Sequence, residues 1–259
     1  MVKAVFFDID GTLVSFNTHT IPQSALDALS ALKDKGIKIF IATGRAMVQL
    51  ETLSELPFDG YITANGAYCT DSQFKLIHKS VIPKEDIEAL IRYQDEKGQF
   101  PVAFMTTQGM TINIIDEKVM ALCRMIDILP PSVKSIRETL HDEVLQLDMY
   151  AKKEQEQEIM QKVLVHCHAT RWNPGFADIN LRGCSKQSGI DHILLHYNIK
   201  LSETMGFGDG GNDIAMLRHV ATGIAMGNAS DEVKRSADYV TDTVDDNGIW
   251  NALKHFGIL

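Results

Sequence analysis

The chain has 259 residues, 45% of them hydrophobic, which is enough for one large domain or two smaller ones with an ample core. It carries 25 lysines and arginines against 34 aspartates and glutamates, so its formal net charge is -9. This balance argues against nucleic-acid and anionic membrane partners, because both require clustered positive charge. It is compatible with a small phosphorylated metabolite, which a metal ion and a few local cations can bind.

No apolar run in the sequence reaches the roughly 20 residues that a membrane-spanning helix needs. The N-terminal segment MVKA leads directly into an apolar stretch followed by acids, unlike a signal peptide. The four cysteines are scattered and form no CxxC pair. We therefore expect free thiols in a cytoplasmic protein, and the large insertion described below favours a monomer.

The N-terminal third of the chain alternates apolar runs with helical patterns. Residues 3–7 form an apolar run that ends in Asp8 and predicts a buried strand of a parallel sheet. A helix is predicted from Pro22 to Gly36. The elements expected next are a strand at 37–42, a helical pattern to about 56, a strand at 61–63, and a hairpin with its turn at 71–72 and its second strand at 74–77. Strands that alternate with helices predict a doubly wound α/β sheet.

The same alternation returns near the C-terminus, whereas the middle of the chain has a different pattern. Near the C-terminus, strands at 205–208, 223–226 and 239–240 alternate with helices starting at 212 and 231 and ending with one at 249–256. In the middle, helices at 83–97, 116–126 and 153–165 accompany strands within 102–115, at 144–150 and on both sides of 173–175. We therefore predict an α+β domain of residues 83–182 inserted into a sheet domain formed by residues 1–82 and 183–259.

Two carboxylates, Asp8 and Asp10, follow the first predicted strand in the segment FDIDGTL. At this spacing, just beyond a buried strand, both can reach one point above the sheet. Such a pair is costly unless a cation or a proton compensates it, and its oxygen ligands suit Mg²⁺. Gly11 allows a tight turn and close approach of the backbone to an anion. A surface Asp-Gly turn is the alternative, but the apolar strand running directly into the segment argues against it.

Two further segments could bind a phosphate group. Thr43, Gly44 and Arg45 lie between a predicted strand and a helix, where a hydroxyl and free backbone amides form an anion site. The same segment could also be an ordinary turn and N-cap. Lys186 could offset clustered carboxylates, although a solvated surface residue is the usual explanation of a single lysine.

The segment at 206–213, GFGDGGND, places another acid beyond a short strand, with glycines on both sides. Helix capping could explain Asn212 or Asp213, but it does not explain Asp209 together with the density of glycine. All four segments fall at the carboxyl ends of predicted strands or on the loop after the insertion. Ligands bind at that edge of open α/β sheets.

On these motifs the chain resembles the haloacid dehalogenase (HAD) superfamily, and specifically its Cof-type phosphatases, which carry a large α/β cap after the second motif. The resemblance spans nearly the whole chain. It rests on the order and spacing of DIDGT at 8–12, TGR at 43–45, NGA at 65–67, Lys186, and GDGGND at 208–213. The family usually has glycine directly after the motif lysine, whereas this chain has Gln187.

The resemblance implies an Mg²⁺-dependent phosphatase that acts through an aspartyl-phosphate. Asp8 would be the nucleophile, and Asp10 would protonate the leaving oxygen and then activate water. Asp8, the backbone carbonyl of Asp10, and Asp209 would hold Mg²⁺. Asp213 would be a further ligand or would orient Lys186 or a metal-bound water. The phosphoryl oxygens would be held by Thr43, the Gly44 amide, Lys186 and Asn212.

The cap would set substrate specificity by closing over the active site. Arg45 would point toward the cleft and meet the substrate, and Asn65 could contact the leaving group, although Asn-Gly is also a strong turn signal. Trp172 and Asp178 are the candidates for substrate binding in the cap. Their alternatives are packing for Trp172 and a solvated strand position for Asp178. Sugar phosphates, nucleotides and cofactor phosphates all fit this class of enzyme.

Two other functions share this pattern. A sugar phosphomutase of the same superfamily would transfer the phosphoryl group to a second sugar hydroxyl instead of water. A non-catalytic phosphate-binding protein would be expected to lack the nucleophile or its partner acid, and both Asp8 and Asp10 are present. A Rossmann dehydrogenase requires a GxGxxG turn after its first strand, where this chain has DIDGT.

Overall fold

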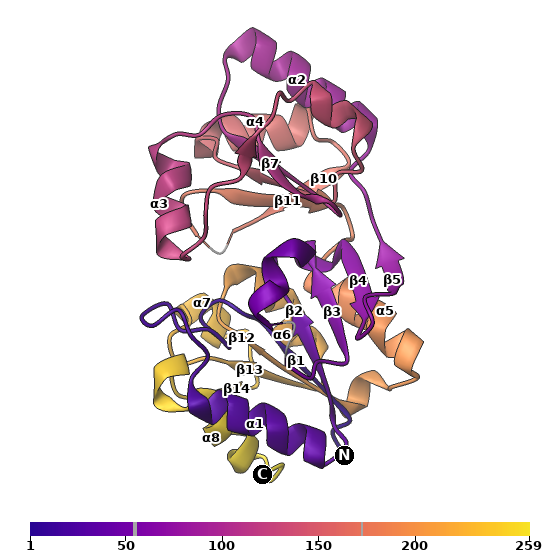
Figure 1. Ribbon diagram of the computed structural model, residues 1–259, viewed down its shortest axis with the longest axis vertical. Coiled ribbons are helices and arrows are strands. Elements are labelled where there is room, and N and C mark those ends of the chain that lie inside the picture. Colours follow the sequence, from indigo (N-terminus) through magenta and orange to yellow (C-terminus); the bar gives the residue numbers. More distant parts are fainter. Residues whose placement is uncertain (54–55, 172) are drawn as a thin grey trace.

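The computed structural model describes residues 1–53, 56–171 and 173–259, which form two sheets, one above the other in Figure 1. The lower one, the core sheet, has the strand order β14-β13-β12-β1-β2-β3-β4-β5. The strands from β14 to β3 are parallel, and β4 and β5 extend the sheet in an antiparallel manner. The bounds are β1 (Ala4–Phe7), β2 (Lys38–Ala42), β3 (Gly60–Thr63), β4 (Tyr68–Asp71), β5 (Leu76–Lys79), β12 (Thr204–Gly208), β13 (Thr222–Ala225) and β14 (Tyr239–Val240).

Both faces of the core sheet are apolar, as parallel strands require, and helices cover each of them. Along β1, Val5 and Phe7 belong to the apolar cluster of one face, and Phe6 belongs to the cluster of the other. The first face is covered by α1 (Gln23–Asp34) and α8 (Gly248–His255), and the second by α5 (Lys186–Tyr197), α6 (Ile214–His219) and α7 (Asp231–Lys234). This architecture confirms the predicted doubly wound α/β fold.

The upper sheet is built from residues between 83 and 182, which we call the cap, and has the order β10-β11-β9-β6-β7-β8. Its strands are antiparallel except for the pair β7 and β8. The bounds are β6 (Val102–Thr106), β7 (Gly109–Ile112), β8 (Ser132–Val133), β9 (Gln146–Met149), β10 (Cys167–Thr170) and β11 (Ala177–Leu181), with helices α2 (Lys84–Lys97), α3 (Glu117–Met125) and α4 (Lys153–Lys162).

The two faces of the cap sheet differ in chemistry. Leu147 and Met149 on β9 pack in the apolar cluster under α2 and α4, on the side away from the core sheet. Because side chains alternate along a strand, Gln146 and Asp148 point the other way, toward the core. Helix α3 lies beside this second face, where Val119 joins a smaller apolar cluster. The cap therefore presents a partly polar face to the carboxyl edge of the core sheet.

The structure differs locally from the predicted elements. The helical pattern expected up to about residue 56 is a 3-10 helix at Met47–Leu53, with residues 54 and 55 outside the described part. Strand β8 and helix α5 were not predicted. Gly189 weakens the helical pattern of α5 because glycine has low helix propensity. It is needed there, since a Cβ at this position would lie 2.5 Å from Ile62 Cγ2 on β3.

Two expectations from composition can be compared with the structure. The four cysteines are free and buried, which fits the expected thiols. Within the described residues, no helix combines the length and the apolar character needed to cross a membrane.

Candidate active site

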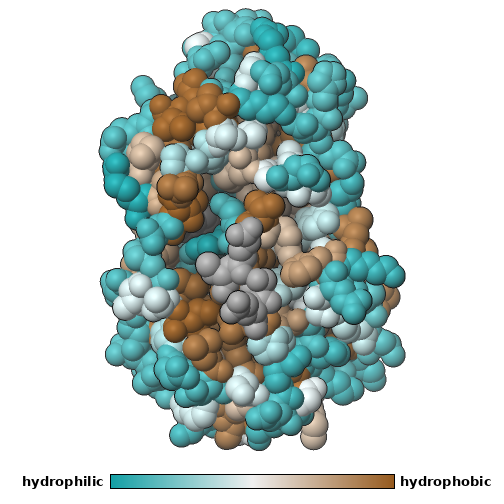
Figure 2. Space-filling model, viewed as in Figure 1, coloured by the Kyte–Doolittle hydropathy of each residue, from teal (hydrophilic) through white to brown (hydrophobic). Residues whose placement is uncertain are grey.

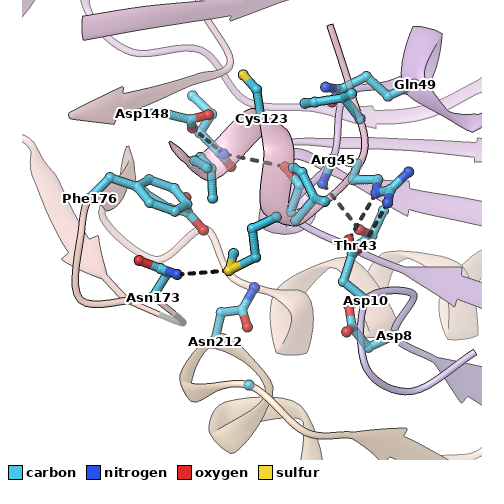
Figure 3. A pocket seen from close by; sticks show the side chains of 18 of the residues that line it. Asp8, Asp10, Thr43, Arg45, Gln49, Cys123, Asp148, Asn173, Phe176 and Asn212 are labelled. Atoms are coloured by element: carbon cyan, nitrogen blue, oxygen red, sulfur yellow. Dashed lines mark hydrogen bonds and ion pairs between the residues drawn. The ribbon is translucent and has the colours of Figure 1, made fainter. Parts of the chain in front are cut away.

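A cavity of about 520 Å³ lies between the carboxyl edge of the core sheet and the cap, and residues of both line it. Hydrophobic side chains flank the hollow between the two parts on the face shown in Figure 2. Figure 3 shows Asp8, Asp10 and Arg45 on one side of the cavity and Asp148 and Phe176 on the other. The site expected at the carboxyl ends of the core strands is therefore a space shared with the cap.

Lys186 joins two carboxylates at the core side of the cavity. Its Nζ donates hydrogen bonds to Asp8 Oδ1 and Asp213 Oδ1, each at 2.6 Å, and its side chain is fully buried. Ser185 caps α5 and accepts a hydrogen bond from the backbone of Ser188, so Lys186 is the first residue of the helix. The lysine is thus a buried counter-ion and not a solvated surface residue.

Burial and the neighbouring charges shift the pKa values of this cluster. Desolvation, together with the charge of Asp213, raises the pKa of Asp8 to about 7, against the lowering effect of Lys186. Burial alone would lower the pKa of Lys186, but Asp213 and Asp8 outweigh it and raise that pKa above its usual range. The lysine therefore stays charged and stabilises the ionised carboxylates.

Both carboxylate oxygens of Asp213 accept hydrogen bonds within the protein. Its Oδ1 accepts from Lys186, and its Oδ2 accepts from the backbone N–H groups of Asp209 at 3.0 Å and Gly210 at 2.8 Å. Gly208 makes room for this carboxylate, because a Cβ there would lie 2.5 Å from Asp213 Cγ. The arrangement fixes both Lys186 and the loop that carries Asp209.

The site can accommodate a divalent metal ion. Asp8, Asp209 and Asp213 each offer a carboxylate oxygen, and these oxygens lie within 4.8 Å of one another. Burial, with the charges of Asp8 and Asp213, raises the pKa of Asp209 well above its usual value. Lys186 is the one cation bonded to this group among the described residues. An excess of buried negative charge on hard oxygen ligands fits Mg²⁺.

Asp10 and Arg45 form a two-pronged ion pair. Arg45 Nε donates to Asp10 Oδ2 at 2.8 Å, and its Nη2 donates to Asp10 Oδ1 at 2.6 Å. Both side chains are 17% exposed and line the cavity. Arg45 faces the cleft as expected, but its guanidinium is engaged by Asp10 (Figure 3). Such paired bonds orient a carboxylate firmly.

The segment at 43–45 also brings the core close to the cap. Thr43 is buried, and its Oγ1 accepts from the backbone N–H of Arg45 at 3.1 Å. A Cβ on Gly44 would lie 3.1 Å from Asn65 Nδ2 and 3.4 Å from Asp178 Oδ2. The Gly44 carbonyl accepts from Gln146 of the cap. Glycine thus leaves room for the cap to approach the core backbone at this position.

Asn65 connects the cap to the core. It is 3% exposed and has a left-handed backbone, with φ 52°. Its Nδ2 donates to Gln146 Oε1 at 3.0 Å and to Asp178 Oδ2 at 2.8 Å, and its Oδ1 accepts from Asn212 at 3.0 Å. The turn conformation and the cap contact thus occur together at this residue. Asn212 itself lines the cavity (Figure 3).

The cap contributes residues that sequence reasoning missed. Asp178 is buried at the cavity, and its role in substrate binding stays a prediction, whereas Trp172 lies outside the described residues. Gln146, Asp148 and Tyr150 also line the cavity. Their signal was the alternation in residues 144–150, where the apolar side chains on one face imply a second face turned elsewhere.

Comparison with known proteins shows that this fold belongs to a class of hydrolases. The family model described as haloacid dehalogenase-like hydrolase matches residues 5–253, and the chain belongs to this family. It is 32% identical to the Bacillus subtilis protein YkrA, named provisionally as a phosphatase, over 99% of this chain and 98% of that protein.

Solved structures give the same assignment. A sugar phosphatase of HAD subclass IIB shares 45% identity and a TM-score of 0.91, with 100% of both chains covered. A phosphatase of this superfamily from Bacteroides thetaiotaomicron shares 43% identity and a TM-score of 0.92, covering 100% of this chain and 96% of that one. The resemblance to Cof-type phosphatases is therefore confirmed, and the chain is a phosphatase of this family.

Proposed function

We propose that the chain is an Mg²⁺-dependent phosphatase that hydrolyses small phosphomonoesters through a phosphorylated Asp8. The observation that carries this proposal is the buried cluster in which Lys186 joins Asp8 and Asp213 beside Asp209 and at the edge of a cavity. One oxygen of Asp8 is held by Lys186, which leaves Oδ2 to attack phosphorus. Because the carboxylate is oriented before substrate arrives, little reorganisation is required.

Asp8, Asp209 and the backbone carbonyl of Asp10 would hold the metal. When bound, Mg²⁺ neutralises negative charge on the transferring phosphoryl group and on the clustered carboxylates. Asp213 acts by positioning, since its oxygens already bind Lys186 and the Asp209 loop. The phosphoryl oxygens would be held by Thr43, the Gly44 amide, Lys186 and Asn212.

Asp10 is the proton-transfer group in this proposal. It gives a proton to the leaving oxygen as the bond to phosphorus breaks, and it later accepts a proton from the water that attacks the phosphorylated Asp8. Arg45 holds both Asp10 oxygens. Arg45 therefore sets the position of Asp10 in both steps.

The proposal is tested by measuring phosphate release from a panel of phosphomonoesters, with Mg²⁺ or a chelator, for the wild type and Asp8→Asn. Release that requires both the metal and Asp8 supports it. Metal-independent release, or an active Asp8→Asn variant, would overturn it. Conversion of a sugar phosphate to its isomer without free phosphate would identify a phosphomutase instead. Phosphate binding with neither reaction would identify a non-catalytic protein.

A further inference from the structure

Two buried carboxylates of the cap face each other across neighbouring strands. Asp148 on β9 and Asp178 on β11 are directly paired in the antiparallel register, and they are 8% and 2% exposed. Like charges at directly opposed positions destabilise a sheet. Their presence on a cavity wall therefore calls for a compensating group.

The protein supplies this pair with neutral partners. Asp148 Oδ1 accepts from Gln146 Nε2 at 2.8 Å, and Asp178 Oδ2 accepts from Asn65 Nδ2 at 2.8 Å. Within the described residues, neither carboxylate forms an ion pair, and one oxygen of each has no hydrogen-bond partner. Burial raises the pKa of Asp148 to about 6. Burial, followed by the charge of Asp148, raises that of Asp178 as well. Two acceptor oxygens are thus left over at the cavity.

An apolar surface adjoins the carboxylate pair. The rings of Tyr150 and Phe176 stack with their centroids 5.5 Å apart and an angle of 25° between their planes. Both rings line the cavity, and Figure 3 shows Phe176 beside Asp148. Aliphatic and sulfur-containing side chains of the cap also line the cavity, among them Met105, Met110, Cys123, Ile126 and Ile128. A flat apolar surface beside hydrogen-bond acceptors is suited to a ring that has a carbon face and polar edges.

The cavity has little to offer a second anion. Among the described residues that line it, Arg45 is the only cation, and Asp10 already engages its guanidinium. The acids on the same lining are Asp8, Asp10, Asp148, Asp178 and Asp209. Away from the phosphate position, an anionic group would therefore meet carboxylates that form no ion pair, with the charges of Lys186 and Arg171 acting on Asp178 only from outside the cavity lining.

We propose that Asp148 and Asp178 select phosphomonoesters whose leaving group presents hydroxyl or amino hydrogen-bond donors and carries no second anionic group, with its carbon face against Tyr150 and Phe176. This inference rests on the proposed phosphatase function and narrows its substrate class. An ammonium group is favoured over a neutral hydroxyl at this position, and a carboxylate is disfavoured.

The test uses three hexose-derived 6-phosphates that differ in charge, namely glucosamine 6-phosphate, glucose 6-phosphate and the open-chain 6-phosphogluconate, with phenyl phosphate as an ester that lacks donors. For the wild type, kcat/KM is expected to fall in that order across the three sugar esters. In Asp148→Asn and Asp178→Asn, the amide keeps one acceptor oxygen and replaces the other with a donor. Each variant is expected to lose about 10- to 100-fold in kcat/KM on glucosamine 6-phosphate, the value of hydrogen bonds to charged groups.

The selectivity change separates substrate binding from structural damage. For both variants, the loss in kcat/KM on phenyl phosphate should be at least about tenfold smaller than the loss on glucosamine 6-phosphate. The ratio of kcat/KM between glucose 6-phosphate and 6-phosphogluconate should decrease. Asp95→Asn, an exposed acid on α2 beyond the other face of the cap sheet, should behave as the wild type. Equal losses on phenyl and sugar esters, or a wild type that prefers 6-phosphogluconate, would overturn the inference. The ranking of the three sugar esters by the wild-type protein tests the inference even if a variant fails to fold. Absence of phosphate release from every ester, phenyl phosphate included, would instead count against the proposed function.

Discussion

The core and the cap each bury a group of carboxylates at the same cavity, but they compensate the charge differently. In the core, Lys186 bonds to Asp8 and Asp213, and backbone amides fill the remaining oxygen positions of Asp213. In the cap, Asp148 and Asp178 receive hydrogen bonds from neutral amides. A carboxylate whose charge is compensated within the protein does not depend on the ligand for a partner. A buried carboxylate that lacks a partner is stabilised only by a ligand that supplies a hydrogen-bond donor or a positive charge, so it distinguishes among ligands.

The largest expected effect comes from Asp8→Asn. If the core cluster does the chemistry, this variant loses phosphate release by roughly 10³-fold or more, as nucleophile substitutions do. The loss should be the same for sugar esters and for phenyl phosphate, because it lies in a step common to both. Initial rates with Mg²⁺ measure it, and circular dichroism checks the fold. A loss confined to sugar esters would break the distinction between core and cap.

Replacing Lys186, the counter-ion of the core cluster, tests how much this cluster contributes to the free energy of unfolding. Lys186→Met leaves Asp8 and Asp213 buried without their cation, and the free energy of unfolding should fall by about 3–5 kcal/mol. Urea unfolding in the presence of a chelator gives this value without help from metal binding. Lys35→Met, at an exposed position, is the matched control. A loss below about 1 kcal/mol would show that the protein does not depend on the internal ion pair.

Neutralising a carboxylate of the cap pair, Asp148 and Asp178, should raise the free energy of unfolding instead of lowering it. The pKa of Asp148 is about 6 in the folded protein against 3.8 for the free group. The unfolded chain therefore releases this proton first, and the folded state loses stability as pH rises from about 4 to 6. Asp148→Asn removes that loss. The variant should gain on the order of 2 kcal/mol over the wild type above pH 6, and little below pH 4.

Unfolding curves at pH 4, 6 and 8 measure this difference, with Asp95→Asn as the control. A variant that is less stable than the wild type at pH 8 would show that Asp148 is compensated within the fold. Higher stability combined with weaker turnover of sugar esters would show that the cap gives up stability for selectivity.

The smallest effect is expected where the two regions meet. Asn65→Gly keeps the left-handed backbone but removes the hydrogen bonds to Gln146, Asp178 and Asn212. KM should rise by roughly tenfold, the low end of what three lost hydrogen bonds contribute, because the cap is held less firmly over the core. Steady-state kinetics on glucose 6-phosphate measure it. An unchanged KM would show that Asn65 serves only the turn.

Much of the core could be predicted from the sequence because the patterns that indicate it are local. An apolar run that enters Asp8 and Asp10, and a glycine-rich segment around Asp209, place acids at strand ends whatever the rest of the chain does. The alternation of strands and helices then brings those ends to one edge. The expected metal-binding role of Asp213 stays a prediction. The structure adds what the sequence did not indicate, namely that both oxygens of Asp213 accept hydrogen bonds from Lys186 and two backbone amides.

The sequence by itself determined the doubly wound core, the inserted cap and the acids at the carboxyl edge of the core sheet, since each follows from periodicity or from short contiguous motifs. Only the tertiary structure decided which side chains contact one another. The pairing of Asp10 with Arg45, the opposition of Asp148 and Asp178, and the contacts of Asn65 depend on strand register and on how the cap lies against the core. Those features arise from packing between residues that are far apart in the sequence, up to 147 positions for Asn65 and Asn212, where local patterns carry no information about which side chains meet.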